Sequence, residues 1–210
     1  GAASLYIVPA LAEALLTRFR PFLDKARNLK RLICGGAPVP QALVDAYDKL
    51  GIQVMTGYGL SECAPLVSLN TRMKKDAIGM PGSYCKVRIA DDGEIQVRGE
   101  NVMKSYYKNE AATRAAFTED GWFRTGDLGR LDEDGCLYLN GRIKNLIILG
   151  NGENVSPEEL ETLAVNQIPG VRDALVTEEK QTLAIALFVE GDTGEEALAN
   201  ARASIAELNK

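Results

Sequence analysis

The stretch Arg31-Leu-Ile-Cys-Gly-Gly36 decides the fold of the first part of this 210-residue chain. Its first four residues form a short, largely apolar run typical of a strand, and two glycines follow directly. A helix is expected to start near Pro40 and to stop at Gly51, because proline suits a first helical turn and glycine ends helices. Ile52–Thr56 then predicts a second strand. A strand–helix–strand unit of this length predicts parallel pairing through a right-handed crossover, with ligands beyond the carboxyl ends of the strands.

The residues before this unit predict a helix, and their longest apolar run, Leu5–Leu16, does not predict a membrane span. Pro9 and Glu13 interrupt the run, and no uncharged apolar stretch reaches the roughly 18 residues that a spanning helix needs. Apolar residues recur at three- and four-residue steps, which indicates a helix that Pro21 bends or ends. The residues on this apolar face are Leu11, Leu15, Phe19 and Phe22.

The middle of the chain is expected to be rich in β-structure. Two pairs of strand-like runs flank the turn sequences Asp91-Asp-Gly93 and Asp132-Glu-Asp-Gly135, so both pairs predict hairpins. The paired runs are Lys86–Ala90 with Glu94–Arg98, and Leu128–Leu131 with Cys136–Leu139. Between the hairpins, Asn109–Phe117 predicts a short helix.

The last part of the chain predicts a small α+β unit. Asn145–Leu149 is apolar and strand-like, and Ser156-Pro-Glu-Glu159 combines a capping box with a first-turn proline, so a helix should begin there and run to about Val165. Two paired strands and an Ala-rich helix are expected to follow. Their ranges are Val171–Val176, Thr182–Val189 and Glu195–Leu208.

Composition excludes several functional classes. The net charge is −5, and Lys and Arg are scattered, so a nucleic-acid partner is not expected. The chain has no histidine, which excludes a Ser-His-Asp or Cys-His nucleophile and a His-bearing zinc site within it. Its 4 cysteines form no CxxC pair, which argues against a compact metal site or a disulfide scaffold and favours a reducing cytoplasm. Chemistry must therefore come from carboxylates, hydroxyls, Lys, Arg or the backbone.

The string Thr56-Gly-Tyr-Gly-Leu-Ser-Glu62, directly after a predicted strand, has residue types that suit a phosphate ligand. Its glycines allow close approach of the backbone, and Tyr58 offers an aromatic face. Ser61 can donate a hydrogen bond to a phosphate oxygen, and Glu62 is a hard oxygen ligand suited to Mg²⁺. Taken alone, the string also fits a Gly-rich turn with a solvated glutamate.

Two further strings, Trp122-Phe-Arg-Thr-Gly-Asp127 and Gly141-Arg-Ile-Lys144, suit a sugar ligand. Asp127 can accept hydrogen bonds from both hydroxyls of a ribose, and Arg142 offers a fixed fork of donors. Individually, the first string also fits a turn beside a core tryptophan, and the second fits a solvated hairpin exit. The hairpin between them folds the chain back, so Asp127 and Arg142 are expected to meet in space.

Read with Gly35-Gly-Ala-Pro38, in this order and spacing, these strings resemble the AMP-forming adenylating superfamily of acyl-CoA synthetases, firefly-type luciferases and peptide-synthetase adenylation domains. The runs Gly141–Gly150 and Glu153–Glu161 are most similar to long-chain fatty acyl-CoA ligases. The resemblance implies a mixed α/β and α+β fold that forms part of the large adenylating domain. Its expected segments are an α/β segment at 1–65, a β-rich, barrel-like segment at 66–143, and a truncated small C-terminal α+β domain at 144–210.

The resemblance also implies roles for individual residues. Ser61 is expected to contact the α-phosphate, and Glu62 to coordinate Mg²⁺. Lys144 matches the hinge about which the family's small domain swings between adenylation and thioester formation. The residues expected to bind adenine are Gly36, Ala37, Pro38 and Tyr58; those beside the acyl site are Gly57 and Gly59; those on the ribose are Asp127 and Arg142.

The implied enzyme is a ligase that uses ATP, Mg²⁺ and coenzyme A to convert a fatty acid into acyl-CoA, with AMP as a product. Peripheral membrane contact stays open for the full-length enzyme only. The chain carries neither the family's phosphate loop nor its late Gly-Lys pair, so we expect an inactive fragment, cut at both ends. Smaller departures are Ser61, where the family often has Thr, and Arg124, where many ligases have His. An aryl- or amino-acid-adenylating ligase and a non-catalytic AMP-binding or interaction domain remain alternatives.

Overall fold

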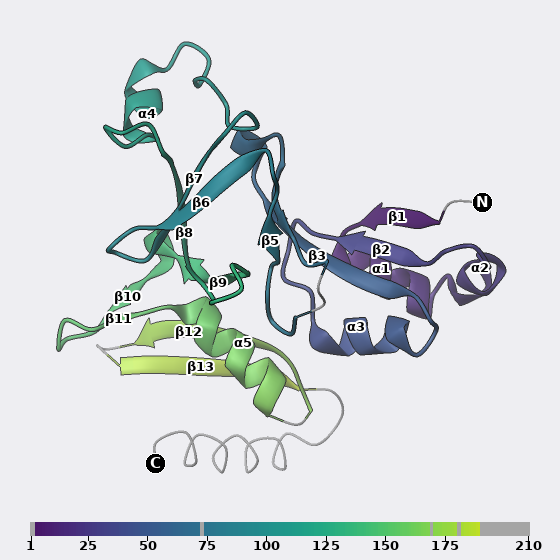
Figure 1. The fold of residues 1–210 in the computed structure, drawn as a ribbon. Helices are drawn as coiled ribbons and strands as arrows, with labels where there is room; N and C mark the ends of the chain where they lie inside the picture. Colours follow the sequence, from purple (N-terminus) through teal and green to yellow (C-terminus); the bar gives the residue numbers. More distant parts are fainter. Residues whose placement is uncertain (1–2, 72–73, 169, 180–181, 190–210) are drawn as a thin grey trace. The chain divides into compact units, whose positions relative to one another are not determined.

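The computed structural model describes residues 3–71, 74–168, 170–179 and 182–189 (Figure 1). The chain forms two compact units: Gly1–Thr125 with Gly129–Leu139, and Gly126–Leu128 with Asn140–Lys210. The helix expected over Glu195–Leu208 lies outside the described residues. Within the described ranges, no helix is both long enough and apolar enough to cross a bilayer.

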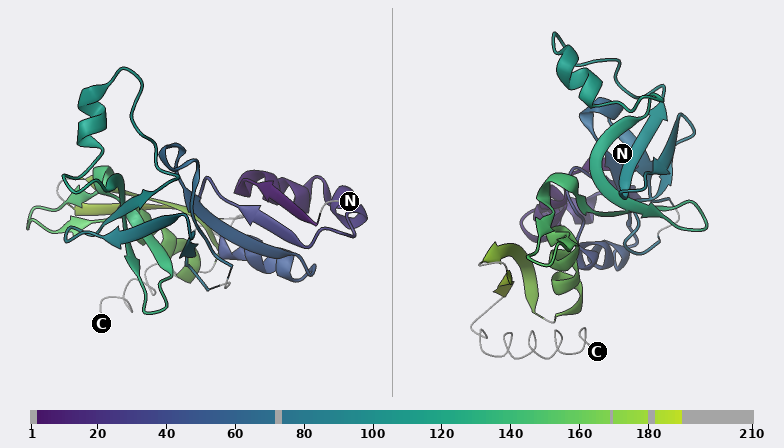
Figure 2. Two further views of the ribbon diagram at one scale, coloured as in Figure 1. Left: turned by 45° about the horizontal axis from the view of Figure 1, so that its top comes forward. Right: turned by 90° about the vertical axis from the view of Figure 1, so that its left-hand side faces the viewer.

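The first unit opens with a parallel sheet, which confirms the predicted strand–helix–strand arrangement. Its elements are β1 (Ser4–Ile7), α1 (Pro9–Thr17), α2 (Arg20–Lys25), β2 (Arg31–Cys34), α3 (Gln41–Asp48) and β3 (Gln53–Gly59). β2 pairs in parallel with both β1 and β3, and Figure 2 shows the three strands side by side. The helix predicted before β2 is two helices, and Pro21 lies in the first turn of α2 instead of ending α1. Strand β1 was not predicted.

Helices α1 and α3 share one core with the sheet. Alternate strand residues Leu32, Cys34 and Val54 are buried together with Tyr47 of α3 and Ala12 of α1. The Tyr47 hydroxyl donates to the Ala12 carbonyl at 2.7 Å, and burial raises the pKa of Tyr47 to about 12. This core holds the two helices against the strands and leaves the carboxyl ends of the strands to connecting loops.

The β-rich part of this chain follows β3. Its elements are η1 (Ser61–Cys63), β4 (Leu66–Leu69), β5 (Met80–Pro81), β6 (Cys85–Ile89), β7 (Glu94–Gly99), α4 (Glu110–Ala115), β8 (Phe123–Leu131) and β9 (Leu137–Arg142). The last four strands form one sheet in the order β6-β7-β8-β9. The hairpin predicted around Asp91-Asp-Gly93 is confirmed by the antiparallel pairing of β6 with β7. The predicted helix is α4, and Asn109 caps it by accepting a hydrogen bond from the Ala112 amide at 3.0 Å.

The second unit has the predicted α+β character. Its further elements are η2 (Ile143–Asn145), β10 (Ile147–Ile148), β11 (Asn154–Val155), α5 (Pro157–Gln167), β12 (Val171–Glu179) and β13 (Thr182–Val189). β12 and β13 pair antiparallel as predicted, and α5 lies along them (Figure 1). A small core joins Ala164 of α5 to Val171 and Ala174 of β12.

One local prediction in the second unit is wrong. Helix α5 does begin after Ser156, but the serine side chain does not cap it. The Ser156 hydroxyl instead donates to the Asn140 carbonyl at 2.6 Å. The half-buried Asn140, near the end of β9, therefore accepts through its carbonyl the hydrogen bond that a capping box would direct to the helix amides.

Candidate functional site

In the first unit, the structure brings two of the predicted strings to the carboxyl ends of β2 and β3. Cys34 is level with Thr56 in the parallel register, so Gly35 comes beside Gly57. A Cβ on Gly35 would lie 3.1 Å from the Gly57 carbonyl oxygen, which explains a small residue there. The following loop, Gly36–Pro38, is exposed. This is the end of a parallel sheet where ligands are expected.

The glycine pattern after β3 is dictated by backbone packing. A Cβ on Gly59 would lie under 3.0 Å from the Pro65 carbonyl, a separation that real side chains do not show. The Leu60 amide donates to the same carbonyl at 2.8 Å, which closes a tight loop. Tyr58, one residue earlier, is 8% exposed and belongs to the core of the β-rich part. The loop delivers Ser61 exposed and Glu62 half-buried on η1.

Glu62 is held by a segment that sequence reasoning did not identify. The Tyr106 hydroxyl donates to Glu62 Oε1 at 2.9 Å, and the Met103 amide donates to the Glu62 carbonyl at 2.7 Å. Burial, and then the Glu62 carboxylate, raise the pKa of Tyr106, so its phenol stays a donor. Tyr106 lies 44 positions from Glu62, and no local pattern marks it.

The residues around Glu62 fit a magnesium ion that is shared with a ligand. Within the described ranges, no three acidic, His or Cys side chains gather as a metal cage. Mg²⁺ is commonly bound by one or two carboxylates, with water and phosphate oxygens in the other positions. Oε1 of Glu62 accepts from Tyr106, and in the described part of the chain Oε2 has no protein donor. One carboxylate oxygen is thus available to a cation.

In the second unit, Asp127 and Arg142 meet, as the hairpin predicted. Arg142 Nε lies 2.8 Å from Asp127 Oδ1; the Asp127 side chain is 4% exposed, and that of Arg142 is 63% exposed. Such a pair presents carboxylate oxygens and guanidinium N–H groups close together. This set of acceptors and donors can recognise the hydroxyls of a sugar.

Lys144 lies just beyond this pair, exposed on η2. The backbone on either side of it is tied to the start of α5. Gly141 has φ +133°, and a Cβ there would lie under 3.0 Å from Ser156 Oγ. On the other side, the Asn145 amide donates to the Glu158 carboxylate. Lys144 therefore projects from a short connection whose two sides lie close to the start of α5.

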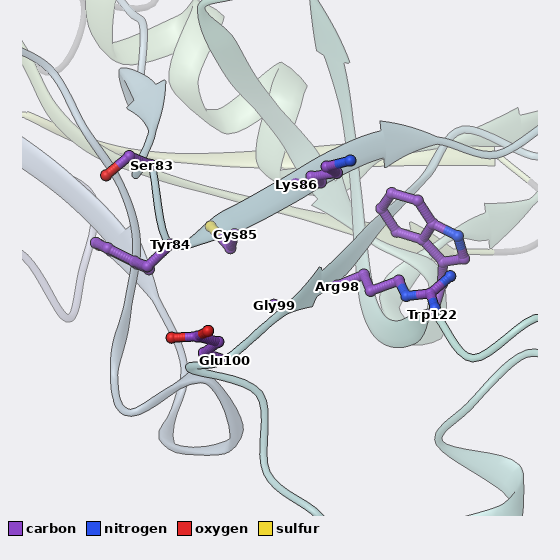
Figure 3. Close-up of a pocket in the computed structure, with 8 residues that line it drawn as sticks. All are labelled: Ser83, Tyr84, Cys85, Lys86, Arg98, Gly99, Glu100 and Trp122. Atoms are coloured by element: carbon purple, nitrogen blue, oxygen red, sulfur yellow. The ribbon is translucent and has the colours of Figure 1, made fainter.

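A separate groove of about 620 Å³ lies on β6 and β7, and none of the predicted site residues lines it (Figure 3). Lys86 and Arg98 stand directly opposite each other on the two strands and line the groove with Trp122. The Arg88 guanidinium lies 4.6 Å from the Trp122 ring centre and pairs with Asp120 at 2.7 Å. Its charged lining residues are Lys86, Arg98 and Glu100, and the groove was not predicted.

Comparison with known proteins shows similarity to AMP-binding enzymes and CoA ligases. Residues 1–107 match the profile of the family described as AMP-binding enzyme. Long-chain-fatty-acid–CoA ligase FadD15 of Mycobacterium bovis is 45% identical over 136 residues, covering 64% of this chain and 22% of that protein. The 2-succinylbenzoate–CoA ligase of Bacillus velezensis is 40% identical over 163 residues, covering 71% of this chain and 33% of that protein.

A solved structure agrees over most of the fold. O-succinylbenzoate coenzyme A synthetase from Bacillus subtilis, in complex with ATP and magnesium ion, matches with a TM-score of 0.74 and 30% identity. The match covers 93% of this chain and 44% of that one, so the chain spans less than half the length of the proteins it resembles here. The chain belongs to the AMP-binding enzyme family. The predicted resemblance and the mixed α/β fold class are confirmed.

Proposed function

We propose that this chain carries nucleotide-binding residues of an AMP-forming acyl-CoA synthetase that activates a long-chain fatty acid. In this proposal Ser61 contacts the α-phosphate, Glu62 binds Mg²⁺, and Lys144 is a hinge. The residues assigned to adenine are Gly36, Ala37, Pro38 and Tyr58; those assigned to the acyl site are Gly57 and Gly59; those assigned to the ribose are Asp127 and Arg142. Four free, buried cysteines support a cytoplasmic location as part of the proposal.

The proposed chemistry has two steps. A carboxylate oxygen of the fatty acid attacks the α-phosphorus of ATP, the bond to pyrophosphate breaks, and an acyl-adenylate forms. The coenzyme A thiolate then attacks the acyl carbon, and AMP leaves. Because ATP converts a poor electrophile into a mixed anhydride, the protein mainly positions groups and stabilises phosphate charge. When bound, Mg²⁺ supplies positive charge beside the phosphate oxygens.

The observation that carries this proposal is the burial of Asp127 beside an exposed arginine. Removing a carboxylate from water is costly, and a turn or a solvated hairpin exit does not require it. An acceptor that must bind ligand hydroxyls does require a fixed carboxylate with its oxygens oriented. At 4% exposure, Asp127 is held in this way, while the 63% exposed Arg142 stays accessible.

Isothermal titration of the complete protein with AMP tests the ribose assignment. Asp127→Asn should weaken AMP binding by roughly 10- to 100-fold, because a hydrogen bond to a charged group contributes about 1.5–3 kcal/mol. Glu133→Gln removes one charge from the exposed turn of the same hairpin and is the control. Equal AMP affinity in both variants would contradict the ribose assignment.

The choice of acid rests on the relatives. FadD15, named as a long-chain-fatty-acid–CoA ligase, supports a fatty acid, and the 2-succinylbenzoate–CoA ligase supports an aryl acid as the second candidate. Pyrophosphate exchange of the complete protein with palmitate or with 2-succinylbenzoate separates them. AMP binding without exchange on any acid would favour a non-catalytic binding domain.

We expect the 210 residues alone to show no exchange, because they contain no Ser/Thr/Gly-rich phosphate loop.

A further inference from the structure

We propose that Tyr106 is the positioning residue of the Glu62 carboxylate, and that residues 101–106 form a bracket that fixes Glu62 for a divalent cation. This inference rests on the proposed function, in which Glu62 meets Mg²⁺. It adds a residue that no motif marks, from a segment that lies between strand β7 and helix α4.

The bracket first fastens the backbone at Glu62 and in the residues that follow it. The Asn101 side-chain amide donates to the Cys63 carbonyl at 3.1 Å and to the Leu66 carbonyl at 3.0 Å. The Met103 amide donates to the Glu62 carbonyl at 2.7 Å. Three hydrogen bonds from one short segment thus hold η1 and the start of β4, so the Glu62 backbone has little freedom.

The bracket then fastens the carboxylate itself. The Tyr106 hydroxyl donates to Glu62 Oε1 at 2.9 Å. The Tyr106 backbone is in turn anchored to helix α4, because its amide N–H donates to Thr113 Oγ1 at 3.0 Å, and that hydroxyl donates to the Asn109 carbonyl at 2.8 Å. Asn109 is also the N-cap of α4. The residue that bonds the carboxylate is therefore anchored to a helix through its backbone.

The two oxygens of the Glu62 carboxylate have different surroundings. Oε1 takes the phenol, while Oε2 accepts no hydrogen bond from the described residues. The hydrogen bond from Tyr106 already restricts the rotation of the carboxylate. Binding a cation through the other oxygen therefore costs less conformational entropy. Hydrogen-bond partners of metal ligands commonly act in this manner, and their removal lowers metal affinity.

The neighbouring Tyr107 supplies a matched control. It is 86% exposed, and the Lys108 ammonium lies 5.2 Å from its ring centre. Tyr106→Phe and Tyr107→Phe each remove one phenolic oxygen from adjacent positions. Only the first removes a hydrogen bond to Glu62.

The test measures Mn²⁺ binding by electron paramagnetic resonance in the complete protein, with the uncleavable analogue α,β-methylene-ATP. Tyr106→Phe should weaken Mn²⁺ binding by about tenfold, the lower end of the range for such partners. Its melting temperature should stay within about 3 °C of the unmodified protein, and Tyr107→Phe should bind Mn²⁺ normally. Equal Mn²⁺ affinity in Tyr106→Phe and Tyr107→Phe would overturn the inference.

Two further variants keep the test decisive. If Tyr106→Phe does not fold, Thr113→Val keeps the phenol but removes the hydrogen bond that anchors the Tyr106 backbone; weaker Mn²⁺ binding supports the bracket, and unchanged binding contradicts it.

Glu62→Gln separates this inference from the proposed function. If Glu62→Gln leaves Mn²⁺ binding intact, the metal assignment of the proposed function is wrong. If Glu62→Gln abolishes binding and Tyr106→Phe has no effect, only the role of Tyr106 is wrong.

Discussion

The segments Gly57–Glu62 and Gly141–Lys144 both carry motif residues, but they are built differently. In the first, a carbonyl occupies the space that a Gly59 side chain would need, and Glu62 is bonded through both its carbonyl and its carboxylate. In the second, Arg142 is 63% exposed and held through one ion pair, and Lys144 is exposed. The first segment belongs to the packed structure, whereas the second displays side chains from it.

This difference between the two segments decides whether a substitution can change ligand binding without also changing stability. Where packing dictates the residue type, substitution removes structure and ligand binding together. Where a side chain is exposed, substitution removes its chemistry and leaves most contacts intact. Tests of stability should therefore show large effects where backbone packing excludes a side chain, as at Gly59, and small ones at exposed side chains such as Lys144.

The largest effect is expected at Gly59. In Gly59→Ala, the new methyl group would overlap the Pro65 carbonyl, so the backbone must shift. Overpacking of this kind typically costs about 3 kcal/mol. Gly57→Ala is the control, since its Cβ would be 3.3 Å from a flexible Leu66 methyl group and should cost under about 1 kcal/mol. Urea unfolding of the complete protein measures the free energy of unfolding of both variants. Equal losses of stability would contradict the conclusion that packing dictates glycine at position 59.

Gly141→Ala tests whether the second segment also contains a position dictated by packing. The left-handed φ of +133° and the Ser156 hydroxyl both oppose a side chain, and we expect a loss of about 2 kcal/mol. A smaller loss is expected when Gly141→Ala is made in a Ser156→Ala background, because the overlap with the hydroxyl is removed while the backbone strain and the nearby Glu158 carboxylate remain. Additive losses in the double variant would show that the hydroxyl is not the obstacle.

A pH-dependent effect is expected in the loop that supports Gly57–Glu62. Of its described residues, 70–71 and 74–77, Ala77 accepts a hydrogen bond from Thr56 through its carbonyl at 3.1 Å, and Lys74 pairs with Asp132 at 2.7 Å. The hydrogen bond from Lys74 lowers the pKa of Asp132 to about 2, from an ordinary value of 3.8. Its contribution to stability is therefore complete above about pH 4 and is lost as the pH falls through 2.

Lys74→Met removes that contribution. The stability difference from the unmodified protein should be largest near neutral pH and should shrink as the pH falls from 4 to about 2. Lys75→Met, at the exposed neighbouring position, is the control and should not change the acid profile. A difference that stays constant down to pH 2 would contradict the role of the ion pair.

Turn chemistry was the most informative part of the sequence. The turns Asp91-Asp-Gly93 and Asp132-Glu-Asp-Gly135 located two hairpins, and the second predicted that Asp127 and Arg142 meet. These features follow from residues that are close along the chain. Strand β1 was missed because its four residues run directly into the apolar start of α1, so the two-residue alternation of a strand cannot be recognised there.

Long-range contacts account for what the sequence could not predict. Ser156 fits a capping box, yet the Asn140 carbonyl takes its hydroxyl. Pro21 was expected to bend or end a helix, but the chain breaks before it and proline then suits the first turn of α2. Tyr106 reaches Glu62 only because the fold brings the two segments together. Such partners leave no periodic signal.

The smallest effect on stability is expected at Lys144. Within the described part of the chain, its ammonium forms no ion pair, so Lys144→Ala should change the melting temperature by less than about 2 °C.

If Lys144 is a hinge, the backbone there must change φ and ψ between the two half-reactions. Lys144→Pro in the complete protein should then slow thioester formation more than adenylation, and limited proteolysis should cut near residues 142–152. Lys144→Ala controls for loss of the charge alone. Equal losses of both half-reactions in Lys144→Pro would indicate an ordinary surface lysine, and the contrast between the two segments would then rest on stability alone.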